Sequence, residues 1–521
     1  MAKTGNEWLA ESLANAQRYA LGNILESSKI TPKQRTFLVK QGYLKKIIRG
    51  WYLLDADLSV VSAGDSALWN ESLWAFIGQY VQQKFSQQYC LSPEVSLGLL
   101  TGNNAFPKQL VIFIDDISPR KIDLPNNLSL LLISSSKPSY QTTQFQGVII
   151  HTLESALVAI GPSFFHQNSL TVQIALLQAN MSELEKAIVS SKNQAAGNRL
   201  IGAYFALNKP TVAEGLQYVM QSMGFQAVAA NNPFSTPPLI LEHVQRESPS
   251  ALRIRLLWQK MRGDVLACFA DIAPPHDFKQ RSQQELEETM QHVYVSDAYH
   301  SLSIEGYQVT TELISRIAQG DWSPESLQQD RSQRDALAAK GYYDAFYLVK
   351  DLLLGVHQSD RFNLQDTLNQ AISRWYRALF QPCVNAGIIN ALDLAGFRKG
   401  PIYIRGSLHT PPPSEQLMDC MEALKDLLST EDDFIVKAIL GHFFLGYIHP
   451  FPDGNGRTAR FLMNFLLLLG GYDWLVINHN TRVGYIAALE QASVDKDIRP
   501  FADFIKQSIV EQATTPLQSH E

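Results

Sequence analysis

The chain has 521 residues, of which 45% are apolar and 18% are charged, and its formal net charge is −6. The length predicts about three domains, and the composition is that of an ordinary soluble globular protein. The small negative charge excludes a general attraction to nucleic acids, so a nucleic-acid surface would have to be a local basic patch.

The cysteines and the apolar segments indicate where the protein is located. The four cysteines are far apart and form no CxxC pair, which argues against a zinc site or a disulfide framework and fits a reducing cytoplasm. The N-terminus is polar and helix-like, without the apolar region of a signal peptide. The most apolar run, 461–478, is interrupted by Asn464, Gly470, Gly471 and Asp473, so it predicts a buried core helix and not a membrane span. We therefore expect a soluble cytoplasmic protein without a membrane partner.

Residues 30–55 (ITPKQRTFLVKQGYLKKIIRGWYLLD) predict a winged helix-turn-helix. Thr31 can cap a helix that has Pro32 at its first position, and a hairpin is expected to turn near Gly50. No acidic residue lies between positions 31 and 50, whereas six cations do: Lys33, Arg35, Lys40, Lys45, Lys46 and Arg49. They predict a surface that neutralises DNA phosphates. The alternative is a solvated basic face on a domain that docks proteins.

The rest of the chain divides into a mixed part and a helical part. From residue 70 to residue 210, helix-like and strand-like runs alternate, which predicts an α+β domain with a helical end and no catalytic cluster. From residue 280 onward the pattern is almost entirely helical. It is interrupted at 402–409 (IYIRGSLH), where a short β-hairpin is expected to turn at Gly406 before Pro411 stops it.

The segment 449–460, with the sequence HPFPDGNGRTAR, predicts an anion site between two helices. The apolar helix before it is expected to end at His449, because Pro450 cannot continue a helix. Gly454 and Gly456 allow positive φ angles, so successive backbone N–H groups can point inward as an anion-binding nest. The N-terminal dipole of the next helix adds to the attraction for phosphate.

Two arginines, one carboxylate and one imidazole surround this nest. Arg457 and Arg460 lie three residues apart and can both bind phosphate oxygens. Asp453 would repel phosphate unless a cation lay between them, so it is a candidate ligand of Mg²⁺. The neutral imidazole of His449 can take a proton from an incoming hydroxyl group. Together these residues predict transfer from a nucleoside triphosphate to a hydroxyl acceptor.

The same segment resembles, without departure, the active-site motif HxFx(D/E)GNGRxxR of Fic-domain proteins, and the resemblance extends over residues 290–510. It implies transfer of AMP from ATP to a Ser, Thr or Tyr hydroxyl of a target protein, with His449 as the base and Asp453 as the Mg²⁺ ligand. The ATP-binding residues that it implies are Gly454, Asn455, Gly456, Arg457, Thr458 and, for the γ-phosphate, Arg460. The segment IYIRGSLH resembles the family's flap, which aligns a target by strand addition. The implied target-docking residues are Ile402, Tyr403, Ile404 and Arg405.

A second feature, SLSIEGYQ (301–308), lies upstream of this motif. Ser301 and Glu305 share one face of a helix, and with Gly306 they match the family's inhibitory pattern [S/T]xxxE[G/N]. A carboxylate delivered to the pocket would pair with Arg460 and occupy the space of the γ-phosphate. The alternative is an ordinary solvent-facing helix end. The resemblance implies a self-inhibited enzyme, and some such proteins also remove AMP with the equivalent glutamate. A further segment, TRVGYIAALEQA with Tyr485, resembles a helix near the family's nucleotide pocket.

The N-terminal half resembles AbiEi-type antitoxins in the segments QGYLKKIIRGWYLL and CLSPEVSLGLLTGNNAFPKQLVIFI. This resemblance implies operator binding or control of a toxin-like partner. The predicted organisation is a winged helix-turn-helix at 1–60, an AbiEi-like α+β domain at 61–225, a linker or helical connector at 226–285, an inhibitory-helix region at 286–320, and a mainly α Fic core with its β-hairpin flap at 321–512.

These features give one leading hypothesis and two alternatives. The leading hypothesis is a self-inhibited protein adenylyltransferase that uses ATP and Mg²⁺ and is fused to a winged-helix regulator. Its partners would be a target protein and DNA, and a homodimer is compatible with it. One alternative is a DNA-binding regulator that uses the Fic core as a nucleotide sensor. The other keeps the fold and transfers UMP, phosphate or phosphocholine.

Overall fold

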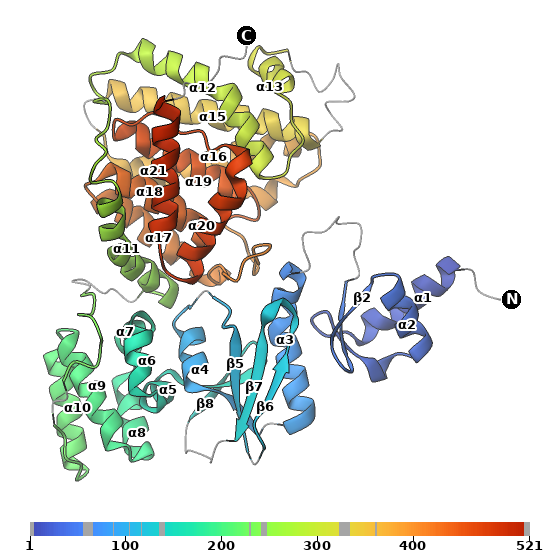
Figure 1. The fold of residues 1–521 in the computed structure, drawn as a ribbon, viewed down its shortest axis with the longest axis vertical. Helices are drawn as coiled ribbons and strands as arrows, with labels where there is room; N and C mark the ends of the chain where they lie inside the picture. The colour runs from blue at the N-terminus through green and yellow to red at the C-terminus, as the bar shows by residue number, and fades with distance from the viewer. Residues whose placement is uncertain are drawn as a thin grey trace. The chain divides into compact units, whose positions relative to one another are not determined.

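The computed structural model describes residues 5–55, 66–86, 88–103, 105–115, 117–134, 141–228, 231–240, 247–321, 334–359 and 362–514. The chain forms two compact units, one made of Met1–Gln245 with Ile402–Thr410 and the other of Arg246–Pro401 with Pro411–Glu521. The first unit is α+β and the second is almost entirely helical (Figure 1). The predicted boundary between 60 and 61 lies outside the described residues.

The first unit begins with a small module of two helices and a sheet. The helices are α1 (Gly5–Tyr19) and α2 (Pro32–Lys40), and the antiparallel strands β1 (Ile24–Glu26), β3 (Trp51–Leu54) and β2 (Leu44–Ile48) pair in that order. Thr31 and Gln34 form a capping box at the start of α2, because each side chain accepts a bond from the other's backbone N–H. The predicted helix and hairpin are therefore confirmed, whereas β1 was not predicted. The winged-helix assignment itself stays a prediction.

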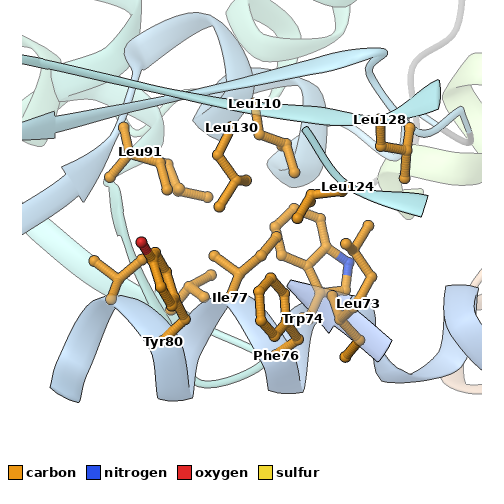
Figure 2. Packing of buried hydrophobic residues seen from close by; sticks show 14 of the residues in the cluster. Leu73, Trp74, Phe76, Ile77, Tyr80, Leu91, Leu110, Leu124, Leu128 and Leu130 are labelled. Atoms are coloured by element: carbon orange, nitrogen blue, oxygen red, sulfur yellow. The ribbon is translucent and has the colours of Figure 1, made fainter. Parts of the chain in front are cut away.

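A second sheet supplies most of the core of the first unit. Its strands β4 (Tyr89–Leu91), β5 (Gln109–Ile114), β7 (Ser129–Ser134) and β6 (Arg120–Asp123) pair in that order, with β5 and β7 parallel. Figure 2 shows Ile77 and Tyr80 of helix α3 (Ser66–Phe85) facing Leu110 and Leu130 of the sheet. Trp51 packs edge-on against Phe76 of the same helix at 5.9 Å, so the N-terminal module shares this core.

The remaining elements of the first unit are a hairpin and a set of helices. The hairpin joins β8 (Thr142–Phe145) to β9 (Val148–His151). The helices are α4 (Pro93–Leu100), α5 (Leu153–Ala159), α6 (Pro162–Gln167), α7 (Ser169–Gln178), α8 (Met181–Ser191), α9 (Gln194–Ala206) and α10 (Pro210–Ser222). The strand-like runs QLVIFID (109–115) and LSLLLISS (128–135) contain β5 and β7, so the alternation of helices and strands expected from the sequence is confirmed here.

The second unit is a bundle of helices. They are α11 (Pro249–Cys268), α12 (Gln283–Ile304), α13 (Thr311–Ala318), α15 (Arg334–Gln358), α16 (Leu364–Asn385), α17 (Leu417–Thr430), α18 (Phe434–Ile448), α19 (Asn455–Leu469), α20 (Arg482–Val494) and α21 (Arg499–Thr514). α18 and α19 lie at its centre and pack on each other, with α11, α15, α16, α17 and α20 around them (Figure 1).

Two sequence predictions gain detail here. Helix α11 lies inside the predicted connector 226–285, but it packs on α17, α18 and α21 and is an integral part of the second unit's core. The apolar run 461–478 supplies the buried part of α19, and the chain turns at Gly470 and Gly471. Within the described ranges, no helix is both long and apolar enough to cross a bilayer.

Candidate active site

His449 ends helix α18 at the mouth of the motif. Its backbone adopts the left-handed conformation with φ of +51°, and its N–H donates to the carbonyl oxygen of Leu445 at 3.0 Å. The Nδ1 atom lies 3.2 Å from the carbonyl oxygen of Gly446, which can only accept, so the proton belongs on Nδ1 and Nε2 is the basic nitrogen. Burial lowers the pKa of His449 to about 4, so the imidazole is neutral at pH 7.

The turn after His449 is fixed by two side chains of the predicted ATP-binding set. Asn455 is buried, and its amide accepts from the backbone N–H of Phe451 at 2.9 Å and donates to the carbonyl oxygen of the same residue at 2.8 Å. The Thr458 hydroxyl donates to the carbonyl oxygen of Gly454 at 2.9 Å. Both side chains brace the loop, so only the backbone of Asn455 remains for the predicted nest.

Both glycines of the nest lie close to a side chain of another residue. Gly454 begins α19 with φ of +76°, and an added Cβ there would lie 2.7 Å from the ring of Phe380. An added Cβ at Gly456 would lie 2.5 Å from Oε1 of Glu305. A carboxylate therefore lies directly against the nest, on the side where the sequence predicts phosphates.

Arg457 is a buried cation whose guanidinium group has no hydrogen-bond partner among the described residues. It is 1% exposed, and its guanidinium carbon lies 5.1 Å from the centres of the Tyr307 and Phe380 rings. Within the described residues, none of its three side-chain nitrogens has a hydrogen-bond partner, and the Asp453 carboxylate lies 3.6 Å away. Buried guanidinium groups normally have acceptors, so this arrangement is suited to a ligand that brings oxygens.

Arg460 makes the contact that the sequence predicts. Its Nη2 donates to Oε1 of Glu305 at 2.7 Å and to the carbonyl oxygen of Ser301 at 3.1 Å, and its Nε donates to the Ser301 hydroxyl at 2.8 Å. Arg460 is 3% exposed and the Glu305 side chain is 31% exposed. Burial raises the pKa of Glu305, but the charges of Arg460 and Arg457 outweigh it and hold the pKa below its usual value.

The helix that carries Glu305 is held at its C-terminal end. Glu305 follows the last residue of α12, and Gly306 with φ of +88° ends the helix. Nε of Arg482 donates to the carbonyl oxygen of Ile304 at 2.7 Å, and Nδ1 of His300 lies 2.9 Å from Nδ1 of His479. These contacts, which the sequence did not reveal, place Ser301 and Glu305 beside Arg460.

Asp453 is the predicted ligand of Mg²⁺. Its side chain is 56% exposed, and Oδ1 accepts from the backbone N–H of Gly454 at 2.5 Å. No group of three or more His, Cys, Asp or Glu side chains able to hold a metal occurs among the described residues. A single exposed carboxylate beside an anion nest fits Mg²⁺, which keeps several waters and completes its shell with phosphate oxygens.

Tyr485 lies in the core beside the motif helices. It is buried, and its hydroxyl lies 2.8 Å from Nε2 of His442 in α18. Burial raises the pKa of Tyr485 and, together with the Arg460 charge, lowers the pKa of His442 to about 3. Tyr485 thus packs between α18 and α20, and its place near a nucleotide stays a prediction.

Arg398 is a residue of the site that sequence reasoning missed. It is buried, and Nε donates to the carbonyl oxygen of His449 at 2.8 Å while Nη1 donates to that of Gly400 at 2.7 Å. Nη2 donates to the carbonyl oxygen of Pro412. Its position two residues before the Gly-Pro step of RKGPIYIRG was the only signal available in the sequence.

The predicted flap, 402–409, lies within Ile402–Thr410, a segment that belongs to the first unit. The structure assigns no strand to it, so the expected β-hairpin is not confirmed, although Gly406 has φ of +73° and Ser407 N–H closes the turn on Ile404 at 3.2 Å. The reason lies in its backbone pairing. Phe106 N–H donates to the carbonyl oxygen of Leu408 at 3.0 Å, and Ala105 and His409 form an antiparallel bridge.

The other flap residues follow this arrangement. The Tyr403 ring stacks on that of Phe106 with centroids 6.3 Å apart, and Asn70 donates to the carbonyl oxygen of Ser407 at 3.2 Å. Ile402, Ile404 and Arg405 lie in the same segment, next to Tyr403. In this structure the segment predicted to dock a target is paired with residues of its own chain.

The six predicted DNA contacts lie on α2, on β2 and in the turn before β3. Lys45 pairs with Asp55 at 3.2 Å, and Arg35 donates to the carbonyl oxygen of Ser27 at 3.3 Å. The ammonium of Lys33 lies 5.3 Å from the centre of the Trp8 ring. Four of the six side chains are exposed: Lys33, Lys40, Lys46 and Arg49.

Known proteins resemble this chain in part. Residues 367–467 match the sequence model of the Fic/DOC family. The chain is 31% identical over 224 residues to "Protein adenylyltransferase Fic" of Nematostella vectensis and 31% identical over 218 residues to the protein of that name in Culex quinquefasciatus. These matches cover 42% and 41% of this chain and 48% and 39% of those proteins, so the chain spans less than half of their length. Among solved structures, Fic-1 (aa134–508) from C. elegans is 17% identical, with a TM-score of 0.36, over 68% of this chain and 93% of that chain.

Proposed function

We propose that this chain, which carries a Fic/DOC domain, transfers AMP from ATP to a hydroxyl group of a target protein and that Glu305 inhibits the transfer. The observation that carries the proposal is the pair between Arg460 and Glu305 at 2.7 Å, directly against Gly456 of the motif. The names of the relatives support the activity, and the pair supports its inhibition.

The chemistry needs a base and an anion site, and the motif offers both. Nε2 of His449 accepts the proton of the target hydroxyl, and the oxygen attacks the α-phosphorus of ATP. A bond forms between this oxygen and phosphorus, the bond to the bridging oxygen of the β-phosphate breaks, and pyrophosphate leaves. Arg457 donates to the phosphates, and Asp453 would hold Mg²⁺, which offsets their negative charge.

Inhibition follows from competition for one cation. Arg460 would bind the γ-phosphate in a productive complex, but its Nη2 is engaged by Glu305. Because Glu305 also lies against Gly456, a triphosphate in the nest would meet a carboxylate at short range. Release of Glu305 from Arg460 therefore has to precede productive binding.

Transfer from labelled ATP to the protein itself and to a cell extract tests the proposal. Glu305→Gly should increase labelling, and the further change His449→Ala should abolish it. Glu288 lies on the exposed face of the same helix, so Glu288→Gln is the matched control and should leave labelling unchanged. Labelling that survives His449→Ala would exclude His449 as the base.

The same assay separates the alternative reactions. Labelled GTP, UTP and CDP-choline in place of ATP test other donors, because nothing in the motif selects the base. AMP removal is tested by incubating the labelled product with the parent protein and with Glu305→Gln. Loss of label in the parent alone would assign removal of AMP to Glu305.

A second function, DNA binding by the N-terminal module, is supported by its exposed cations. Lys40, Lys46 and Arg49 present three positive charges on α2 and on the β2–β3 hairpin. Gel shifts with DNA from upstream of the gene should show binding that weakens with salt. Binding that is insensitive to salt, or none at all, would exclude this function.

A further inference from the structure

Arg398 is a buried cation whose hydrogen bonds converge on backbone carbonyls around His449. It is 6% exposed, and its three guanidinium nitrogens donate to the carbonyl oxygens of His449, Gly400 and Pro412. Its own backbone N–H donates to the carbonyl oxygen of Pro450 at 2.9 Å. The hydrogen bonds that the structure gives its side chain thus all end on backbone oxygens and none on a carboxylate.

Arginine is the side chain best suited to donate to three separate carbonyl oxygens at this position. The guanidinium is a planar fork with five donors at fixed angles, so it can satisfy three acceptors at once, whereas a lysine ammonium is one compact charge. Burying a guanidinium is costly unless such bonds offset its lost hydration. A residue needed only to fill space here would be apolar, so the geometry indicates that Arg398 orders the backbone.

The three carbonyls belong to segments with separate tasks. Gly400 and Pro412 flank 402–410, the segment predicted to dock a target, on its two sides. His449 is the proposed base, and its left-handed backbone conformation is unfavourable for a residue other than glycine. The bond from Arg398 to the His449 carbonyl therefore holds a backbone conformation that the residue would not adopt by preference.

We propose that Arg398 is a positioning residue for AMP transfer, which fixes the His449 backbone relative to both stems of the 402–410 segment. This inference rests on the proposed function. The side-chain hydrogen bonds of Arg398 to the described residues end on the backbone of His449, Gly400 and Pro412, so its proposed role is to orient the base and the incoming hydroxyl and not to bind ATP.

The kinetic test compares Arg398→Met and Arg398→Lys in the Glu305→Gly protein. Arg262→Met is the matched control, because Arg262 also ties a helix to a loop, through Glu431 before α18. Arg398→Met should lower kcat by about tenfold or more, as expected when reacting groups are displaced, and leave the KM for ATP unchanged. Arg398→Lys should recover part of this loss, and Arg262→Met should leave kcat and KM unchanged.

A second measurement does not depend on activity. Burial and then the nearby Arg398 charge lower the pKa of His449 to about 4. The histidine signals of the protein, assigned by comparison with His449→Ala, report this pKa by NMR titration. Arg398→Met should shift it upward, Arg398→Lys should shift it less, and Arg262→Met should leave it in place.

These results separate the two proposals. If Glu305→Gly transfers no nucleotide, the proposed function fails and the NMR titration alone decides the role of Arg398. If the pKa of His449 does not move and Arg262→Met lowers kcat as much as Arg398→Met does, Arg398 is a structural residue and the inference is overturned.

Discussion

Replacing Glu305 by glutamine should lower the stability of the nucleotide-free protein and raise its affinity for ATP. The change keeps the size of the side chain but removes the charge that Arg460 contacts at 2.7 Å. A hydrogen bond between charged groups contributes about 1.5 to 3 kcal/mol. Because the Glu305 side chain is 31% exposed, we take about 1 to 2 kcal/mol for this pair.

Glu305→Gln should bind ATP more tightly by the same free energy, because in the parent protein ATP has to displace Glu305 from Arg460. A change of about 1 to 2 kcal/mol corresponds to binding that is roughly 5- to 30-fold tighter. Calorimetric titration with ATP and Mg²⁺ measures the affinity, and unfolding in urea measures the stability. Both are done with His449→Ala present, so that no transfer occurs during the titration.

The dependence of protein stability on pH tests the contribution of the ion pair between Glu305 and Arg460. The pKa of Glu305 is held below its ordinary value of 4.5, so its contribution to stability is complete above that value and is lost as pH falls through the lower, folded pKa. The stability difference between parent and Glu305→Gln should therefore be largest near neutral pH and shrink below pH 4.5. Equal ATP affinity in both proteins would refute the competition between Glu305 and the γ-phosphate.

Three further predictions concern other parts of the chain. In the Glu305→Gly protein the transfer rate should be independent of pH down to about 5. It should fall only as His449 becomes protonated near its pKa of about 4. A fall near pH 6.5 would show that the surroundings of His449 do not lower its pKa. Gly454→Ala should destabilise the protein by about 1 to 3 kcal/mol in urea unfolding, because φ is +76° and the Phe380 ring leaves no room; an unchanged midpoint would contradict this packing. Lys46→Ala with Arg49→Ala should weaken DNA binding and reduce its dependence on salt by about two charges, and an unchanged salt slope would place the contacts elsewhere.

The sequence predicted the active-site loop well because its signals are local. Pro450 cannot continue the preceding helix, and Gly454 has the positive φ that glycine allows, whereas Gly456 lies inside α19 and is not among the described residues with positive φ. The pair between Arg460 and Glu305 was predicted only because a family pattern supplied the partner, since no periodicity links residues so far apart. The sequence could not reveal the hydrogen bonds between the Asn455 side chain and the Phe451 backbone, because they form only in the folded turn.

The parts that could not be predicted depend on contacts distant in sequence. Strand β1 has three residues and pairs with β3 across the whole N-terminal module, so no alternation could reveal it. Arg398 was not singled out in the sequence, because its three carbonyl acceptors come together only in the folded chain. Residues 402–410 have the turn glycine of a hairpin, but tertiary pairing with Phe106 overrides that preference.

The pairing of 402–410 with Ala105 and Phe106 has a consequence for the order in which the chain folds. Domains generally fold from the N-terminus as synthesis proceeds. The first unit, however, cannot be completed when residue 245 emerges, because one of its own segments lies beyond residue 400. Until then the backbone of Phe106 lacks its acceptor on Leu408 and its ring lacks Tyr403. Cutting the chain after residue 245 would leave the first unit without Ile402–Thr410, which would remain on the fragment that carries the second unit, so one cut cannot divide the chain into its two units.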